Sequence, residues 1–177
     1  PRSIRRDALA SAVSIIKALQ NAMWDDDDIT RFTIGMLNVA PNAPSVVPSK
    51  VVFSIDLRHP DAATLQALGD RIPEICSRNS GRCKASVMQL LHDPPLTFPA
   101  EVRTLLGEAA TAVGVPWMDM SSGAGHDARH LSLLCPTGMI FVPCRAGISH
   151  NEAEWAEKEH LTAGARVLAT AVSWLAM

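Results

Sequence analysis

Two short polar segments in the C-terminal third of the sequence carry the residue types best suited to chemistry. The first, residues 121–128, reads Ser-Ser-Gly-Ala-Gly-His-Asp-Ala, and the second, residues 148–154, reads Ile-Ser-His-Asn-Glu-Ala-Glu. An apolar run, Met-Ile-Phe-Val at 139–142, lies between them. Loops placed on a rigid scaffold often carry function. We therefore expect a functional site on these two segments.

The first segment is suited to an anion. Gly123 and Gly125 permit backbone angles and close approaches that present N–H groups to a carboxylate or phosphate. The Leu-Ser-Leu-Leu pattern at 131–134 predicts that a helix begins there and adds the partial positive charge of its N-terminus. His126 either contacts the ligand directly, or it caps the helix or positions another residue that contacts the ligand.

The second segment contains His150, eight residues after Val142 in a polar turn. Imidazole is the commonest metal ligand in proteins and titrates near neutral pH. One histidine cannot hold zinc tightly, because zinc sites use three or four protein ligands. From the residues alone, His150 is either a metal ligand or a hydrogen-bonded loop histidine.

Length, charge and cysteine content limit the function further. The 177 residues suffice for one domain or two small ones, and basic residues are not clustered beyond Arg2, Arg5 and Arg6, so we expect no nucleic-acid partner. No apolar run approaches the roughly 18 residues of a membrane span, and no signal-peptide pattern is present. We expect a cytoplasmic protein with no membrane partner, whose four cysteines are reduced thiols rather than a disulfide framework.

Hydrophobic periodicity predicts a first module over residues 1–92. We expect a helix at 5–22, strands at 30–39 and 51–57 paired as an antiparallel hairpin, a helix from an Asp61 cap to residue 78 with a kink at Pro73, and a strand at 83–91. This order lacks only the first strand of a ferredoxin-like βαββαβ sandwich. The acidic run at 25–28 either binds a cation or forms a solvated loop.

A proline-rich linker at 92–99 separates this module from a second one, which we place at 93–177. A helix is predicted at 100–113 and ended by Gly114, strands at 115–118 and 138–142, and final helices at 153–160 and 161–175. The alternation predicts part of an α/β sheet whose other strands lie outside this sequence. The fold class is therefore α+β or α/β.

Arg58 stands at the end of the second predicted strand, before His59-Pro60. Its side chain is either a solvated charge at the sheet edge or a binding group that forms two hydrogen bonds to a planar carboxylate or ureido group.

Several segments together resemble one enzyme family, the zinc-dependent amidohydrolases that include N-carbamoyl-L-amino-acid hydrolase, allantoate amidohydrolase and β-ureidopropionase. These belong to the aminoacylase and carboxypeptidase-like dinuclear zinc superfamily. The chain is similar to their C-terminal half, in the family's order and spacing. The matching segments are residues 5–9 (Arg-Arg-Asp-Ala-Leu), 41–48, 53–60 (Phe-Ser-Ile-Asp-Leu-Arg-His-Pro), 122–128 (Ser-Gly-Ala-Gly-His-Asp-Ala), 139–143 and 147–151 (Gly-Ile-Ser-His-Asn).

The resemblance implies a role for each module. Residues 1–92 look like a ferredoxin-like lid that forms a homodimer and lacks its first strand, and residues 93–177 look like the closing part of the zinc-binding catalytic domain. His150 matches a terminal zinc ligand, Arg58 an arginine that reaches the substrate carboxylate in the neighbouring subunit, and Gly125 a backbone contact to substrate. His126 adjoins that contact. Ser45 stands where the family usually has a substrate-binding Asn, which is longer.

The implied reaction is hydrolysis of the C–N bond of an N-carbamoyl (ureido) amino acid or a related linear amide. Two zinc ions, or manganese, cobalt or nickel in their place, would activate a water molecule for attack on the carbonyl, with a Glu as base. The general base and the other zinc ligands are expected upstream of residue 1, so no catalytic residue is assigned here and this chain alone is expected to be inactive. Two alternatives stay open: a non-catalytic dimerisation or binding module, and an aminoacylase or dipeptidase of the same superfamily.

Overall fold

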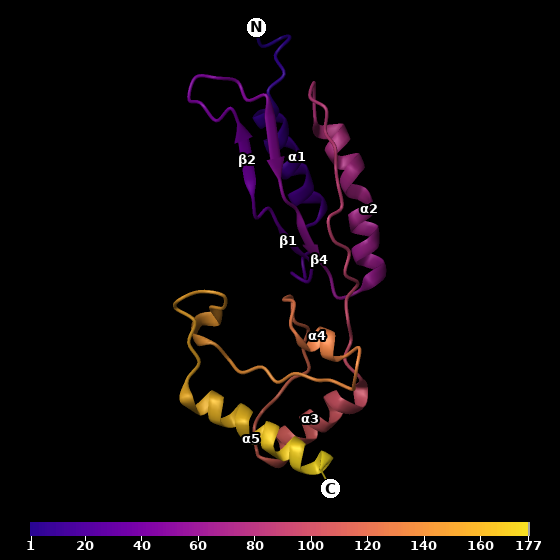
Figure 1. Cartoon of the computed structure of the whole chain (residues 1–177), viewed down its shortest axis with the longest axis vertical. Helices are drawn as coiled ribbons and strands as arrows, with labels where there is room; N and C mark the ends of the chain where they lie inside the picture. Colours follow the sequence, from indigo (N-terminus) through magenta and orange to yellow (C-terminus); the bar gives the residue numbers. More distant parts are fainter. Residues whose placement is uncertain (177) are drawn as a thin grey trace. The chain divides into compact units, whose positions relative to one another are not determined.

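A computed structural model describes residues 1–176 and divides the chain into two compact units, Pro1–Pro95 and Leu96–Met177 (Figure 1). The boundary falls inside the proline-rich segment 92–99. Both units combine helices with extended segments, so the fold is mixed α and β. No helix within residues 1–176 is long and apolar enough to cross a membrane.

The first unit is a two-layer arrangement of two helices and a narrow β-ribbon. Its elements are α1 (Ala8–Ala22), β1 (Arg31–Thr33), β2 (Leu37–Ala40), β3 (Lys50–Phe53), β4 (Asp56–Arg58) and α2 (Ala62–Asn79). β1 pairs antiparallel with β4, with Phe32 opposite Leu57, and β2 pairs antiparallel with β3, with Val39 opposite Val51. The predicted antiparallel pairing is confirmed, although each predicted strand is divided in two.

Side-chain caps fix where the helices of this unit begin. Asp7 accepts the backbone N–H of Ala10 at 3.0 Å, and Asp61 accepts that of Thr64 at 2.8 Å. Each carboxylate satisfies an N–H that has no partner inside the helix. The Asp61 cap is therefore confirmed, and α2 continues through Pro73 as one helix.

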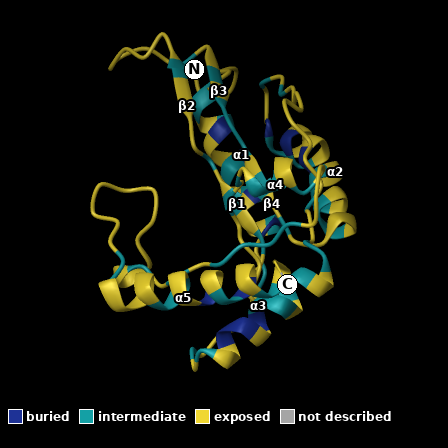
Figure 2. Ribbon diagram, turned by 60° about the horizontal axis from the view of Figure 1, so that its bottom comes forward, coloured by how far each residue is buried: buried dark blue, intermediate teal, exposed yellow. Residues whose placement is uncertain are grey.

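The hydrophobic core of the first unit lies between the two helices and one face of the ribbon. The inward faces of α1 and α2 are buried, as Figure 2 shows. The core contains Ile15, Leu19, Met23, Ile72 and Cys76, with Phe32, Phe53, Ile55 and Leu57 of the ribbon packed against them. Burial raises the pKa of the Cys76 thiol, and all four cysteines are free, as expected.

The second unit is built on two packed helices, α3 (Ala100–Ala112) and α5 (Lys158–Leu175), with the single-turn helix α4 (Ala128–Leu131) and the 3-10 helix η1 (Arg145–Gly147) between them in sequence. The α3–α5 core contains Ala109, Ala110, Val167 and Ala171. The segment 138–142 packs on both helices. A Cβ on Gly138 would lie 2.7 Å from Val102 of α3, and one on Gly164 of α5 would lie 2.7 Å from Val142.

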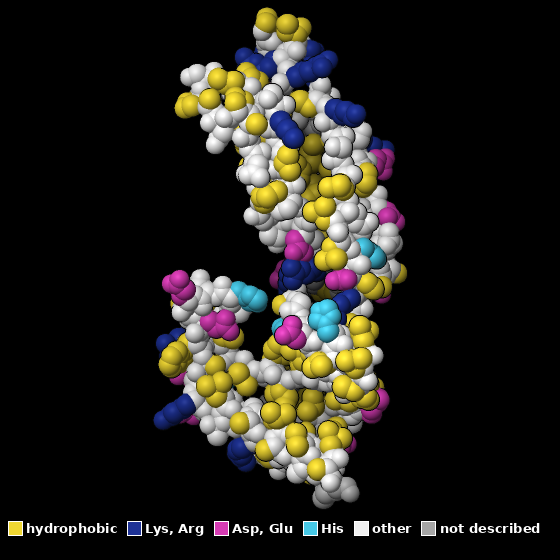
Figure 3. Space-filling model, viewed as in Figure 1, with side chains coloured by type: hydrophobic (Ala, Val, Ile, Leu, Met, Phe, Trp, Pro, Cys, Tyr) yellow, Lys and Arg dark blue, Asp and Glu magenta, His cyan; other side chains and the backbone are white. Residues whose placement is uncertain are grey.

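Three predicted strands, at 83–91, 115–118 and 138–142, are not strands among the described residues. Their apolar sequences favour extended backbone, but a strand also requires a hydrogen-bonded neighbour, and none pairs with them within residues 1–176. Large hydrophobic side chains of these segments consequently reach the surface, among them Leu90 and Met118, and Figure 3 shows hydrophobic side chains on the surface of the molecule.

Two predicted helices are also corrected. The helix expected to begin near Leu131 is the single turn α4, which ends there. Of the helix expected at 153–160, residues 158–160 are helical but belong to α5. Residues 153–157 are not helical, because Trp155 O accepts the backbone N–H of Arg145 at 2.7 Å and Glu157 has extended angles before α5 begins.

Candidate functional site

In the first unit, Arg58 ends β4 and is held by an acidic neighbour on the same strand. Its Nε donates to Asp56 Oδ1 at 2.8 Å, and its Nη2 donates to Asp56 Oδ2 at 2.6 Å. This contact lowers the pKa of the Asp56 carboxyl and raises the pKa of Arg58. Both side chains are about half exposed, at 48% and 50%. The guanidinium therefore lies at the surface and already displays the forked geometry that matches a carboxylate.

A second arginine, Arg31, lies opposite Arg58 across the β1–β4 pair. Like charges directly opposite each other destabilise a strand pair. Each arginine has its own carboxylate, because Arg31 Nη1 lies 3.0 Å from Asp28 Oδ1. Asp25 of the same acidic run accepts the backbone N–H groups of Ile29 and Thr30, at 2.9 and 2.7 Å. These contacts favour the solvated-loop interpretation of residues 25–28 over a cation site.

Ser45 is an exposed residue of the loop between β2 and β3. The N–H of its neighbour Val46 donates to Ala43 O at 3.2 Å, which places Ser45 inside a tight turn. The loop precedes Lys50, and Arg58 follows eight extended positions later, or roughly 26 Å at about 3.3 Å per residue. Within one chain, Ser45 and Arg58 thus lie at opposite ends of the ribbon.

In the second unit, the glycine-containing loop at 121–127 leads into α4. The glycines with left-handed angles among the described residues are Gly81, Gly114 and Gly147, and Gly125 is not one of them. A Cβ on Gly125 would meet no atom within 4 Å. Gly125 therefore does not use the left-handed backbone angles that glycine permits. A helix of one turn also cannot supply the helix N-terminus expected for an anion.

His126 makes both a side-chain hydrogen bond and a ring contact. Its Nε2 lies 2.8 Å from Ser122 Oγ, and its ring packs edge-on against Phe141 with the ring centroids 5.4 Å apart. Its carbonyl accepts the N–H of Arg129 at 3.0 Å at the start of α4. The loop is therefore joined through His126 both to α4 and to the segment 138–142 that leads toward His150.

His150 occupies an unusual backbone position. Its φ is 55°, in the left-handed region that is uncommon for residues other than glycine. The side chain of Glu154 accepts the His150 N–H at 2.9 Å, and Asn151 Oδ1 accepts the N–H of Ala153 at 2.9 Å. The tight turn thus fixes the backbone of His150, while its imidazole has no hydrogen-bond partner among residues 1–176.

The loop that carries His150 is closed at its base by three residues, Arg145, Trp155 and Glu157, which we call the loop clasp. Arg145 donates through Nε and Nη2 to Glu157 Oε1, at 3.0 and 2.7 Å, and its guanidinium lies 5.6 Å from the Trp155 ring centroid. The backbone N–H of Arg145 donates to Trp155 O at 2.7 Å. The ion pair lowers the pKa of the Glu157 carboxyl.

The predicted site residues are divided between the two units. Ser45 and Arg58 belong to the first unit, and Gly125, His126 and His150 belong to the second. Figures 1 and 2 show the 144–157 loop projecting away from α4 within the second unit. Among residues 1–176, no group of three or more His, Cys, Asp or Glu side chains could hold a metal ion. The residues present therefore do not form a zinc site by themselves.

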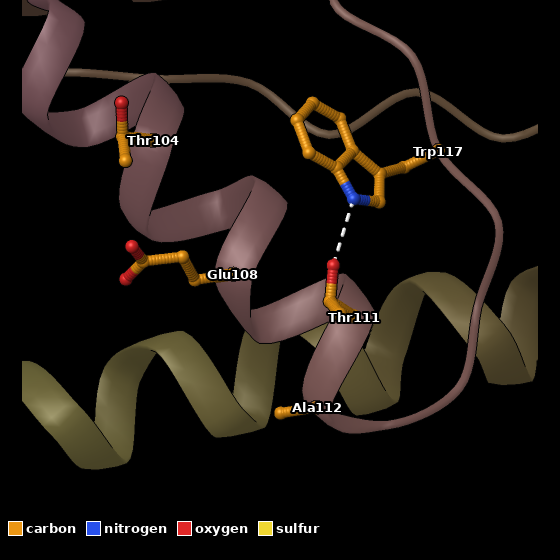
Figure 4. Close-up of a pocket in the computed structure, with 5 residues that line it drawn as sticks. All are labelled: Thr104, Glu108, Thr111, Ala112 and Trp117. Atoms are coloured by element: carbon orange, nitrogen blue, oxygen red, sulfur yellow. Dashed lines mark hydrogen bonds between the residues drawn. The ribbon is translucent and has the colours of Figure 1, made fainter.

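A shallow hollow on α3 lies apart from the predicted site residues. It is lined by Thr104, Glu108, Thr111, Ala112 and Trp117, and the Trp117 indole N–H donates to Thr111 Oγ1 at 3.0 Å (Figure 4). Figure 4 shows Glu108 and Trp117 pointing to different sides of the helix. The hollow thus lacks converging polar groups and is an unsuitable candidate site.

Sequence reasoning missed the partners of the candidate residues. The contact between Asp56 and Arg58 could have been predicted from the sequence, because residues two apart on a strand lie on the same face of the sheet. The contacts of Ser122 and of the loop clasp could not have been predicted, because they depend on the path of irregular loops.

Comparison with known proteins identifies relatives along nearly the whole chain. The model of the family described as Peptidase family M20/M25/M40 matches residues 9–174. An N-carbamoyl-L-amino-acid amidohydrolase from Rhizobium meliloti is 38% identical over 177 residues, covering 97% of this chain and 42% of the relative. An allantoate amidohydrolase from Bacillus subtilis is 33% identical over 168 residues, covering 93% of this chain and 40% of the relative.

Solved structures give the same result. The crystal structure of an amidase of the hydantoinase/carbamoylase family from Burkholderia multivorans superposes with a TM-score of 0.88 at 38% identity, covering 97% of this chain and 42% of that one. The chain therefore spans about two fifths of the length of the relatives it matches.

Proposed function

Because the chain belongs to peptidase family M20/M25/M40, we propose that it forms part of an amidohydrolase that cleaves the C–N bond of N-carbamoyl (ureido) amino acids or related linear amides. The observation that carries this proposal is the 38% identity to an N-carbamoyl-L-amino-acid amidohydrolase across 97% of the chain. Since the chain spans about two fifths of such relatives, the activity is proposed for the protein in which these residues meet the rest of the site.

Recognition of the substrate carboxylate is assigned to Arg58 and the loop at 121–127. The paired hydrogen bonds between Arg58 and Asp56 support this role, because they display the bidentate geometry that a substrate carboxylate would use. Gly125 would contribute its backbone N–H, and His126 a side-chain contact. Ser45 would contact substrate through its hydroxyl, at shorter reach than an Asn.

His150 is proposed as one ligand of a two-ion zinc site, with manganese, cobalt or nickel as substitutes. Its imidazole without a hydrogen-bond partner among residues 1–176 and its fixed backbone support this assignment. Because the described residues include no cluster of three or more potential ligands, the remaining ligands and the general base would come from outside this chain. This chain's part in the reaction is therefore to bind and orient the substrate.

We also propose a cytoplasmic homodimer formed through the first unit, acting as its lid. Support comes from the narrow β-ribbon and its β2–β3 loop, where the apolar side chains of Leu37, Val46, Val47 and Val52 are 40–50% exposed. Exposed apolar side chains beside unpaired strand edges are typical of surfaces that associate.

The test measures ammonia release from N-carbamoyl-L-amino acids and allantoate, together with bound zinc, for the protein at its natural length. His150→Asn removes the imidazole while keeping a residue that tolerates left-handed angles, and we expect it to lose both zinc and activity. Arg58→Lys keeps the charge but loses the fork, and we expect KM to rise at least tenfold. Arg78→Lys is the matched control, since Glu74 on the surface of α2 is the one ion-pair partner of Arg78 among the described residues.

Three results would contradict the proposal. Cleavage of dipeptides or N-acyl amino acids without cleavage of ureido substrates would favour an aminoacylase or dipeptidase. A stable dimer with no hydrolysis would favour a binding module. Full activity in Arg58→Lys would remove the substrate role of Arg58.

A further inference from the structure

Ser122 and His126 form a hydrogen-bonded pair within the glycine-containing loop. The hydroxyl oxygen of Ser122 lies 2.8 Å from His126 Nε2 and also accepts the backbone N–H of Ala124 at 3.2 Å. The edge-on contact with Phe141, at an interplanar angle of 60°, limits rotation of the imidazole. The pair is therefore held by contacts within its own loop and by a contact with the segment 138–142.

The hydrogen bonds available within the loop favour one of the two imidazole nitrogens of His126 as the protonated one. A serine hydroxyl has one proton to donate and two lone pairs to accept with, and one lone pair already accepts from Ala124. If Nε2 were protonated, it would donate to Oγ, and the proton of the exposed Ser122 hydroxyl would be left to solvent, because no residue among 1–176 accepts it. If Nε2 is unprotonated, the hydroxyl donates to it and both bonds are satisfied.

We infer that Ser122 is a positioning residue that keeps the proton of neutral His126 on Nδ1. The bond made by one imidazole nitrogen sets which tautomer is present. The Nδ1 atom has no hydrogen-bond partner among the described residues, so Nδ1–H is a donor available to a ligand.

The same geometry could be read as a nucleophile beside its base, but one element is missing. A histidine that activates a serine is itself oriented by a third group bonded to its other nitrogen. No such group contacts Nδ1 within residues 1–176. The pair is therefore better suited to holding a hydrogen-bond donor in place than to generating an alkoxide.

A fixed Nδ1–H donor complements an acceptor on the ligand, such as a carboxylate or ureido oxygen. This deepens the proposed function and rests on it, because the ligand class comes from that proposal. Ser122 would act on substrate only through His126, by supplying a donor with a defined direction.

Ring 15N NMR on the 177-residue chain labelled at histidine tests the inference without any ligand. The six histidines are assigned by comparison with His126→Gln. At a pH where His126 is neutral, we expect a pyrrole-type signal at Nδ1 and a pyridine-type signal at Nε2. Ser122→Ala should shift the ring toward a mixture of tautomers, and Ser122→Thr, which keeps the hydroxyl, should restore the wild-type signals.

Two results would overturn the inference: a protonated Nε2 in the neutral wild type, or unchanged signals in Ser122→Ala. Loss of folding cannot mimic the expected result, because the other histidine signals report it separately. Addition of an N-carbamoyl-L-amino acid to the protein at its natural length then tests the proposed function. A correct tautomer with no ligand effect on the His126 signals would overturn the ligand role while leaving the tautomer assignment established.

Discussion

Asp56 and Arg58 lie two residues apart on one face of β4 and hold each other through hydrogen bonds of 2.8 and 2.6 Å. The pair fixes the direction of the guanidinium at the end of the strand. It also offsets the repulsion expected from Arg31 directly opposite. A residue predicted to bind a substrate carboxylate thus already rests against a carboxylate of its own chain.

The first prediction concerns Asp56→Asn, which keeps the shape of the side chain and removes its charge. We expect a loss of less than about 1 kcal/mol in the free energy of unfolding at pH 7, because both partners are half exposed. The folded-state pKa of Asp56 is lowered, so its contribution is present above the ordinary value of 3.8 and is lost as the pH falls through the lower folded value. Urea unfolding at pH 7, 5 and 3 should show the two proteins converging at pH 3.

Asp27→Asn serves as the control, because Asp27 is exposed and has no ion pair or hydrogen bond among the described residues. A difference between wild type and Asp56→Asn that persists unchanged to pH 3 would show that the ion pair is not its origin.

The second prediction concerns the turn after α1. Asp25 accepts the N–H groups of Ile29 and Thr30, and bonds from Thr30 and Ile29 hold its pKa at about 2. Because this pKa is lowered, the turn is stabilised above the ordinary value of 3.8 and loses that contribution as the pH falls through about 2. Hydrogen exchange should show the Ile29 and Thr30 amides protected at pH 4 in wild type and in Asp27→Asn. Equal protection in Asp25→Asn would contradict the assignment.

The elements that could be predicted from sequence are those fixed by local interactions. The helices α1, α2 and α3 follow from apolar periodicity, and the Asp61 cap follows from a side chain three residues from its partner. The antiparallel ribbon follows from two adjacent alternating runs. Strand formation at 83–91, 115–118 and 138–142 could not be predicted in this way, because it depends on a neighbour that local sequence does not reveal.

The same distinction applies to the candidate site. His126 and His150 stand out by residue type, and the structure shows both in loops that contain internal hydrogen bonds. The contacts that hold their loops could not be predicted from the sequence. Ser122 contacts His126 within a loop, and Arg145 contacts Glu157, twelve residues further along the chain. The left-handed angle of His150 was also unexpected, since histidine is not a residue that requires it.

The third prediction concerns the loop clasp. Arg145→Gln removes both hydrogen bonds to Glu157 and the stacking of the guanidinium on Trp155. We expect the segment 146–154 to become accessible to limited proteolysis severalfold faster than in wild type, because mobile loops are the preferred sites of cleavage. Lys158→Gln is the matched control, since the Lys158 side chain is exposed and its one ion pair among residues 1–176 is a 3.8 Å contact with Glu159. Equal cleavage rates in Arg145→Gln and Lys158→Gln would show that the clasp does not order the loop.

The fourth prediction tests the packing of Trp117 on α3. A Cβ on Gly107 would lie 2.5 Å from two carbons of the Trp117 ring, whereas a Cβ on Gly69, in the middle of α2, would meet nothing within 4 Å. Alanine in place of a helical glycine gains roughly 0.5–1 kcal/mol when space permits. Overpacking costs about 1–3 kcal/mol. Gly107→Ala should therefore lower the free energy of unfolding, and Gly69→Ala should raise it.

Urea unfolding followed by tryptophan fluorescence suits this comparison, because Trp24 lies in the same unit as Gly69, and Trp117, Trp155 and Trp174 lie in the same unit as Gly107. The double variant Gly107→Ala with Trp117→Leu separates the two contributions. Once the ring is removed, alanine at 107 should no longer be unfavourable relative to glycine in the same Trp117→Leu background. If Gly107→Ala alone stabilises the protein as much as Gly69→Ala does, the Trp117 indole does not pack against the Gly107 backbone. Trp117 would then not line the hollow on α3 in the way described above.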